Sequence, residues 1–296
     1  MTVGSLLEGG FRLVKERPGA MLIWTIIQLA ATIGTSIWMA ANVQGLIDAA
    51  MRGEASLESL QTSFFLQSML VGIVGAIVST ILYAAVQRAI IRPTEGGPGW
   101  LRLGMDEIRY FLLLVLYGII FGVVIIVLGI FLGLFMAGAG AGGSTSMQLV
   151  LIILGFIACS YFGTKLSLSF PLTMKEQTFA IGDGWRLSDG RFWTLYAAYF
   201  IVFLVLLALG IATSFVTEPD YLSAAFRYGF NSPEADLASL AQFQKIAAGT
   251  IDAPIIIGWV LAGLQGAIGA AMLGGAAATA VQELTADEEG LSETFS

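Results

Sequence analysis

The residues of this chain best suited to chemistry are two cations at the ends of long apolar runs. Lys165 occurs in YFGTKLSLSFP, six residues before Pro171, and Arg88 lies five residues before Pro93. A cation within a membrane-spanning helix can attract an anionic substrate. Because Pro171 is only about 9 Å of helix away from Lys165, that side chain can instead extend to the membrane interface. We favour interfacial placement of both cations and keep anion attraction as the alternative.

The residue types of common catalytic and metal sites are missing from the sequence. It has no histidine and one cysteine, Cys159, which excludes histidine ligands, Ser-His-Asp and Cys-His catalysis, and thiolate clusters. No GxxxxGK[ST] loop is present, and GAGAGG at 138–143 is interpreted as a chain reversal. We therefore predict that the protein is not an enzyme, with no catalytic, cofactor-binding or metal-binding residues and no nucleic-acid partner.

Composition indicates that lipid surrounds the elements that carry these cations. Charged residues make up 12% of the 296-residue chain and apolar residues 57%, whereas roughly a quarter of an ordinary soluble domain is charged. The mean hydropathy is +0.84. One water-soluble core could not hide this much apolar surface.

Five stretches without any charge locate the membrane-spanning helices. They are 30, 29, 55, 26 and 30 residues long and cover 18–47, 59–87, 110–164, 192–217 and 253–282. A span needs about 20 apolar residues, so the 55-residue stretch holds two, with a turn at 137–146. The predicted fold is all-α: a single polytopic membrane domain of six transmembrane helices over 1–283, followed by an acidic tail at 284–296.

Three polar and aromatic segments share a pattern of Arg-Leu followed by a second arginine. They are FRLVKERPG (11–19), WLRLGMDEIRYF (100–111) and GDGWRLSDGRFWTLY (182–196). Each precedes an odd-numbered span, which predicts three helix hairpins, each preceded by a short cytoplasmic amphipathic helix. Internal similarity of this kind fixes architecture, and the repeats would be about 1–92, 93–173 and 174–283.

The same segments contain eight of the ten predicted contacts with lipid, and the other two are Arg88 and Lys165. Arginine stems and tryptophan rings favour the headgroup layer of a membrane, and a helix that carries both can lie in that layer. The predicted phospholipid headgroup or anion contacts are Arg12, Arg17, Arg88, Arg102, Arg109, Lys165, Trp185, Arg186, Arg191 and Trp193. We favour the interpretation that these residues are ordinary positive flanks without lipid specificity and keep a dedicated lipid-binding collar as the alternative.

The distribution of lysine and arginine predicts the orientation of the chain. Eleven of the fourteen lie on one side of the six spans, and Arg52, Arg227 and Lys245 lie on the other. The positive-inside rule then places both termini in the cytoplasm. The outer connection should contain an amphipathic helix at 232–246, with Ser232 as its N-cap. Glycines of the span at 253–282 and of the run at 111–135 predict close helix packing, with a homo-oligomer or a substrate path as alternatives.

The run KLSLSFPLTMKEQTFAIGDGWRLSDGRFWTLY (165–196) and its counterpart RAIIRPTEGGPGWLRLGMDEIRYF (88–111) resemble a pattern in bacterial multi-spanning proteins. These include the membrane domain of some glycerophosphodiester phosphodiesterases and the YciC-like uncharacterised inner-membrane proteins. The resemblance implies a bacterial inner-membrane location and a connection with lipids. The hydrolase half of those enzymes has no counterpart here, so phosphodiesterase activity is not carried over.

Together these features predict a non-catalytic integral inner-membrane protein that acts as a lipid-associated structural or regulatory component. The alternative function is a transporter or channel for a small solute or lipid, with a path between the hairpins. In that case Lys165 and Arg88 would attract anions.

Overall fold

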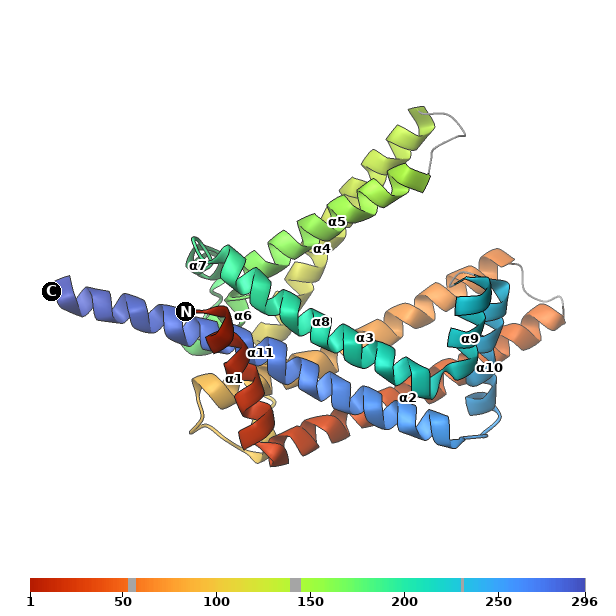
Figure 1. Ribbon diagram of the computed structural model, residues 1–296, viewed down its shortest axis with the longest axis horizontal. Helices are drawn as coiled ribbons and strands as arrows, with labels where there is room; N and C mark the ends of the chain where they lie inside the picture. The colour runs from red at the N-terminus through yellow and green to blue at the C-terminus, as the bar shows by residue number, and fades with distance from the viewer. Residues whose placement is uncertain (53–56, 139–144, 230–231, 296) are drawn as a thin grey trace. The chain divides into compact units, whose positions relative to one another are not determined.

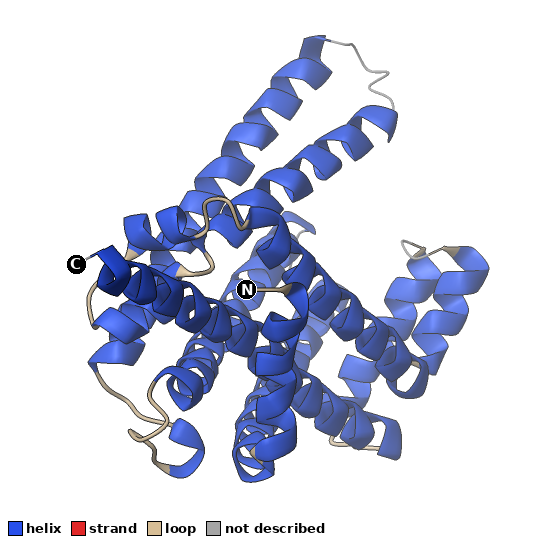
Figure 2. Cartoon of the chain, turned by 60° about the vertical axis from the view of Figure 1, so that its left-hand side comes forward, coloured by secondary structure: helices blue, strands red, loops and turns tan. Residues whose placement is uncertain are grey.

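The computed structural model describes residues 1–52, 57–138, 145–229 and 232–295, and every regular element within them is a helix (Figure 2). In chain order the elements are α1 (Val3–Glu16), α2 (Pro18–Met51), α3 (Leu57–Ile91), the 3-10 helix η1 (Pro98–Trp100), α4 (Met105–Gly138), α5 (Thr145–Leu166), α6 (Ser169–Glu176), α7 (Ile181–Leu187), α8 (Phe192–Thr217), α9 (Pro219–Tyr228), α10 (Pro233–Ala247) and α11 (Ala253–Phe295) (Figure 1).

Six helical stretches are long and apolar enough to cross a membrane, which confirms the prediction of an all-α polytopic membrane protein. They are Pro18–Gly45, Phe65–Ile91, Pro98–Phe131, Ile153–Glu176, Phe192–Thr217 and Ala253–Ala286. Only 6% to 39% of the most apolar window of each stretch is buried inside the protein. Most of this apolar surface therefore faces the surroundings of the protein, as expected for helices that cross a lipid bilayer. The turn predicted at 137–146 falls between α4 and α5, and residues 139–144 lie outside the described residues.

The chain forms two compact units, each built from several separated segments. Unit 1 comprises Met1–Phe11, Tyr83–Ile201 and Leu273–Ser296, and unit 2 comprises Arg12–Leu82 and Val202–Met272. The contacts described below lie within one unit or the other.

In unit 1, one apolar core joins the first residues of α1 to α6, α8 and the last part of α11. Its buried members include Leu6, Leu172, Leu195 and Val281. Two small helix faces allow α1 and α11 to meet: a Cβ added to Gly275 would lie only 2.7 Å from the Cα of Gly10. Helices α4 and α5 run side by side as a hairpin (Figure 1).

In unit 2, α10 packs against α2 and α9. Helix α10 begins where the sequence predicted, because the hydroxyl of Ser232 accepts a hydrogen bond of 3.2 Å from the backbone N–H of Ala235. Ala40, Ile246 and Ile255 form the buried core beneath it. Helix α10 therefore packs on other helices of unit 2.

The glycines of the last span are used for packing within each unit. In unit 2, a Cβ at Gly263 would lie 3.1 Å from the backbone of Leu29, and in unit 1 a Cβ at Gly274 would lie 2.9 Å from Val86. By contrast, a Cβ at Gly118 or Gly122 of α4 would meet no atom within 4 Å. Close packing through glycine thus holds for α11 and not for α4.

The three arginine-bearing segments take different local forms. The first is the 14-residue helix α1 and the third is the seven-residue helix α7. The second begins at the last residue of η1 and has no regular structure at 101–103, and α4 then begins at Met105 and continues directly into its span. Gly99 and Trp100 both have positive φ, at 63° and 53°. That conformation is rare for a bulky residue and it ends η1 in a tight turn.

Candidate functional site

A buried ion pair in unit 1 joins the end of α3 to the start of α4. The side chain of Arg88 is wholly buried, and its guanidinium is paired with the carboxylate of Glu107. It also donates a 2.8 Å hydrogen bond to the carbonyl oxygen of Trp100. The other carboxylate oxygen of Glu107 accepts a 2.9 Å hydrogen bond from the backbone N–H of Gly104. This pairing meets the requirement that a buried charge has a partner and further hydrogen bonds.

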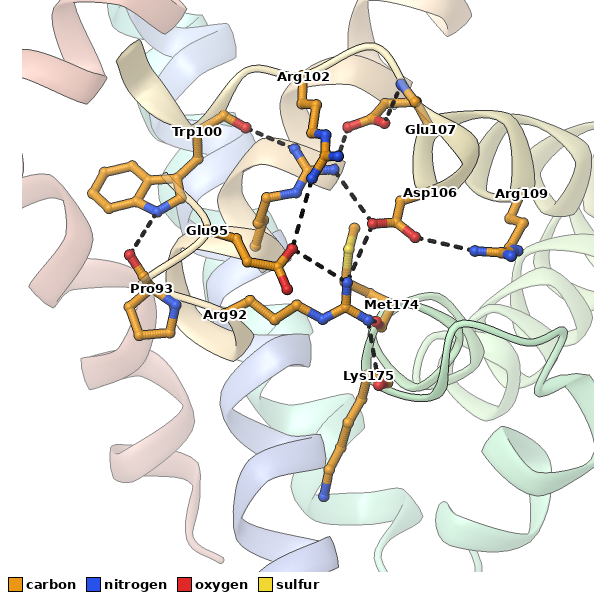
Figure 3. A network of polar contacts seen from close by, with 12 residues as sticks. Arg92, Pro93, Glu95, Trp100, Arg102, Asp106, Glu107, Arg109, Met174 and Lys175 are labelled. Carbon is orange, nitrogen blue, oxygen red and sulfur yellow. Dashed lines mark hydrogen bonds and ion pairs between the residues drawn. The ribbon is translucent and has the colours of Figure 1, made fainter. Parts of the chain in front are cut away.

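Asp106 extends the pair into a network that contains four arginines (Figure 3). Its carboxylate lies 3.3 Å from the guanidinium of Arg92, 3.2 Å from that of Arg109 and 3.8 Å from that of Arg88. Glu95 adds contacts of 3.5 Å to Arg92 and 3.9 Å to Arg102. The network thus holds four positive and three negative side chains. The sharing of Asp106 fixes the first turn of α4 against the end of α3.

Arg92 carries the network to a third helix. Its guanidinium donates a hydrogen bond to the carbonyl oxygen of Met174 and lies 3.4 Å from that of Lys175, at the C-terminal end of α6. The last carbonyls of a helix have no partner within the helix, and a cation there is favoured by the helix dipole. Arg92, the residue that follows α3, therefore acts as a cap for α6.

A second cation, Lys165, is neutralised at the end of α5. Its ammonium is paired with Asp189, which follows α7, and lies 5.4 Å from the ring centre of Trp185. A cation at this distance from an indole face is attracted to the ring. The Lys165 side chain is buried, while that of Asp189 is 61% exposed. The pair therefore lies at the boundary between the interior of unit 1 and its surroundings.

Aromatic rings from three helices of unit 1 gather beside this pair. The ring centre of Tyr161 lies 6.1 Å from that of Trp185 and 5.3 Å from that of Phe192. Phe192 in turn lies 5.2 Å from Trp193 and 5.8 Å from Tyr196. The cluster of Tyr161, Trp185, Phe192, Trp193 and Tyr196, named here the aromatic cluster, packs α5, α7 and α8 together. Trp193 is nevertheless 77% exposed.

The structure brings some of the predicted contact residues together and separates others. Arg88, Arg102 and Arg109 share the arginine–carboxylate network, and Lys165 and Trp185 share the second pair. Arg186, Arg191 and Trp193 are exposed in unit 1, and Trp193 belongs to the aromatic cluster. Arg12 and Arg17 are exposed in unit 2 and take no part in the described ion pairs of unit 1.

The interfacial interpretation expected the side chain of Arg88 to extend to the surface of the protein. It is instead buried in unit 1, where its guanidinium is paired with Glu107 and donates to the carbonyl of Trp100, while its Nε has no hydrogen-bond partner among the described residues. The side chain of Lys165 also ends on a carboxylate, that of Asp189. Sequence reasoning missed Asp106, Glu107 and Asp189. A signal was available, since all three lie within the same arginine-bearing segments and close in sequence to the start of a span.

Two open clefts of unit 1 flank the network. One, of about 210 Å³, is lined by Glu95, Arg102, Asp106, Glu107 and Arg109 among others. The other, of about 360 Å³, is lined by Ile91, Arg92, Lys175, Gln282, Thr285 and Ala286. Within the described residues, no group of three or more histidine, cysteine, aspartate or glutamate side chains is arranged to hold a metal ion.

Comparisons with known protein families, with curated proteins and with solved structures gave no match to this chain.

Proposed function

We propose that the chain is a non-catalytic integral membrane protein that associates with anionic phospholipid. The observation that carries this proposal is the exposure of Arg186, whose side chain is 82% accessible, and of Trp193, a member of the aromatic cluster that is 77% exposed. Leu103, next to Arg102 at the start of α4, is 82% exposed as well. Exposed cations with aromatic and apolar neighbours, at the ends of apolar spans, are typical of a surface that lies in the headgroup layer.

The transport alternative relied on Lys165 and Arg88 as cations that attract anions. Each is paired with a carboxylate within unit 1, so neither brings an uncompensated positive charge into a span. This pairing supports lipid association over transport.

The lipid proposal predicts that Arg186→Gln/Arg191→Gln/Trp193→Ala weakens binding of anionic lipid. Basic residues near an anionic membrane surface contribute about 1 kcal/mol each, so loss of two should weaken retention of phosphatidylglycerol by roughly tenfold to thirtyfold. The measurement is native mass spectrometry of full-length protein from nanodiscs that contain phosphatidylcholine and phosphatidylglycerol.

The matched control removes two arginines and one aromatic ring from the connections on the other predicted side of the membrane. Arg52→Gln/Arg227→Gln/Tyr228→Ala also deletes two positive charges and one exposed ring. It should retain phosphatidylglycerol as the unaltered protein does. Equal loss in both triple variants would refute a dedicated lipid-contact surface and leave ordinary charge attraction.

We further propose that both termini are cytoplasmic, in the inner membrane of a bacterium. The support is the excess of lysine and arginine on one side of the six spans. A cytoplasmic reporter fused after Ser296 should be active, and the same reporter inserted near Pro233 should be inactive. The opposite result would reverse the orientation.

We propose three repeated units because three segments share the Arg-Leu pattern. The proposal is supported by the position of α1, of the segment 98–104 and of α7, each of which precedes the first helix of a predicted hairpin. Because the three segments differ in local structure, only their shared sequence pattern and their order along the chain support a common origin.

A further inference from the structure

The short helix α9 follows the span α8 after a break in the backbone. Glu218 has a non-helical conformation, with φ of −132° and ψ of 51°, and Pro219 is the first residue of α9. A proline disfavours the helical conformation in the residue before it, so α8 ends at Thr217 and α9 begins as a separate helix. Helix α9 is ten residues long and ends at Gly229, whose φ is 106°.

The ten residues of α9 divide into three faces. Ala225 is buried, and α9 packs against α10. Asp220 and Arg227 are both exposed and lie on one polar stripe, because seven residues make about two helical turns. Phe226 and the half-buried Leu222, four residues apart, form an apolar face. Phe226 is 67% exposed, so this apolar face is directed to the surroundings of the protein.

The apolar face of α9 continues the exposed apolar surface of α8. The rings of Phe226 and Phe215 are stacked, with centres 6.3 Å apart and an angle of 17° between their planes. Phe215 belongs to α8 and is itself 56% exposed. Only 6% of the most apolar window of this span is buried inside the protein. The two rings therefore extend onto α9 the same surface that α8 turns toward the bilayer.

The stacked rings lie at the depth where the hydrocarbon of a bilayer ends. Phe215 is about 16 Å of helix away from the midpoint of α8, at 1.5 Å per residue. Half of a hydrocarbon core of roughly 30 Å is about 15 Å. A span that is centred in the bilayer thus places Phe215, and with it Phe226, at the boundary between acyl chains and headgroups.

We propose that α9 is an interfacial helix, which inserts Phe226 and Leu222 into the bilayer beside the end of α8. Amphipathic helices bind membranes by burying an apolar face at the boundary of headgroups and acyl chains. The polar stripe of Asp220 and Arg227 then faces the headgroups and water. The guanidinium of Arg227 lies 5.9 Å from the ring centre of Tyr228, and tyrosine is enriched at this depth of a membrane.

The occupant of the apolar face is lipid, because the face is narrow and continuous with a lipid-facing span. Asp220 offsets the charge of Arg227 on the polar stripe, so the contact is apolar and does not select anionic lipid. The inference therefore goes beyond the proposed function, which rests on exposed cations of unit 1. No residue of α9 belongs to that surface.

The test measures the depth of α9 in a bilayer that contains no anionic lipid. Cys159 is the one cysteine of the sequence, so Cys159→Ala gives a background for attaching a single nitroxide. The nitroxide is attached through Phe226→Cys, Arg227→Cys or Leu209→Cys in full-length protein, which is placed in phosphatidylcholine nanodiscs. Electron paramagnetic resonance then reports the accessibility of each nitroxide to oxygen, which concentrates in hydrocarbon, and to a water-soluble nickel chelate.

The two other positions are references for lipid and for water. Leu209 is 40% exposed near the middle of α8, and Arg227 lies on the polar stripe of α9. The ratio of oxygen to nickel accessibility at position 226 is expected to be several-fold above that at 227 and below that at 209. Equal ratios at 226 and 227 would show that Phe226 faces water. Low accessibility of position 226 to both reagents would show that protein covers it, and either result would overturn the proposal.

Discussion

Replacement of Glu107 with glutamine is expected to lower the free energy of unfolding by about 3–5 kcal/mol. The substitution removes the closest carboxylate from the fully buried guanidinium of Arg88 and leaves it only the longer, 3.8 Å contact with Asp106. Removal of one partner is the costly way to break a buried ion pair. The carbonyl of Trp100 still accepts one hydrogen bond, but it brings no negative charge. Because Glu107 also accepts the N–H of Gly104, the turn before α4 should loosen at the same time.

The measurement is the unfolding transition of purified protein in lipid nanodiscs, compared among three variants. Arg88→Met/Glu107→Leu removes both charges together and should recover most of the stability lost in Glu107→Gln, since neither buried charge then remains. Arg102→Gln is the control for an exposed pair, with an expected cost of roughly 0–1 kcal/mol. If the unfolding midpoint of Glu107→Gln equals that of the unaltered protein, Arg88 and Glu107 do not form a buried ion pair in lipid.

Replacement of Gly275 with leucine is the second change with a large expected effect. The first added atom would lie 2.7 Å from the Cα and 3.0 Å from the backbone N of Gly10, and backbone atoms cannot rotate away. Overpacking typically costs about 1–3 kcal/mol, occasionally more. We expect the upper part of that range, together with faster hydrogen exchange at residues 3–11, because α1 must move off α11 to make room.

Gly118→Ala supplies the matched control for that substitution. It adds a methyl group to α4 at a position where nothing lies within 4 Å, and alanine is a better helix former than glycine by roughly 0.5–1 kcal/mol. Stability should stay the same or rise slightly. Unchanged hydrogen exchange of α1 in Gly275→Leu would contradict the close contact of α1 with α11.

Helix positions were the part of the fold most accessible from the sequence. The charge-free stretch 192–217 has the same bounds as α8, and the predicted outer helix at 232–246 differs from α10 by one residue at each end. Both follow from local physics: apolar length in the first case, and a serine cap followed by proline in the second.

The pairing of charges was not accessible in the same way. Arg88 meets Glu107 across 19 residues, and Lys165 meets Asp189 across 24. Each partnership depends on the path of a turn, and one of those turns relies on the unusual positive φ of Trp100. The positive-inside rule counts basic residues and gives acidic ones little weight, so it offered no reason to seek partners for the arginines. Arg88 and Lys165 were assigned to the membrane interface, and each is paired with a carboxylate instead.

The cap that Arg92 places on α6 has a consequence for biogenesis. Arg92 precedes its acceptor, the carbonyl of Met174, by 82 residues. At translation rates of about 5–20 residues per second, Arg92 is synthesised roughly 4–16 s before Met174. Asp106 follows Arg92 by only 14 residues, so it is available to neutralise the arginine during insertion. Asp106 is thus the partner of Arg92 in the nascent chain, before α6 has been synthesised. In the folded protein the same carboxylate belongs to the arginine–carboxylate network.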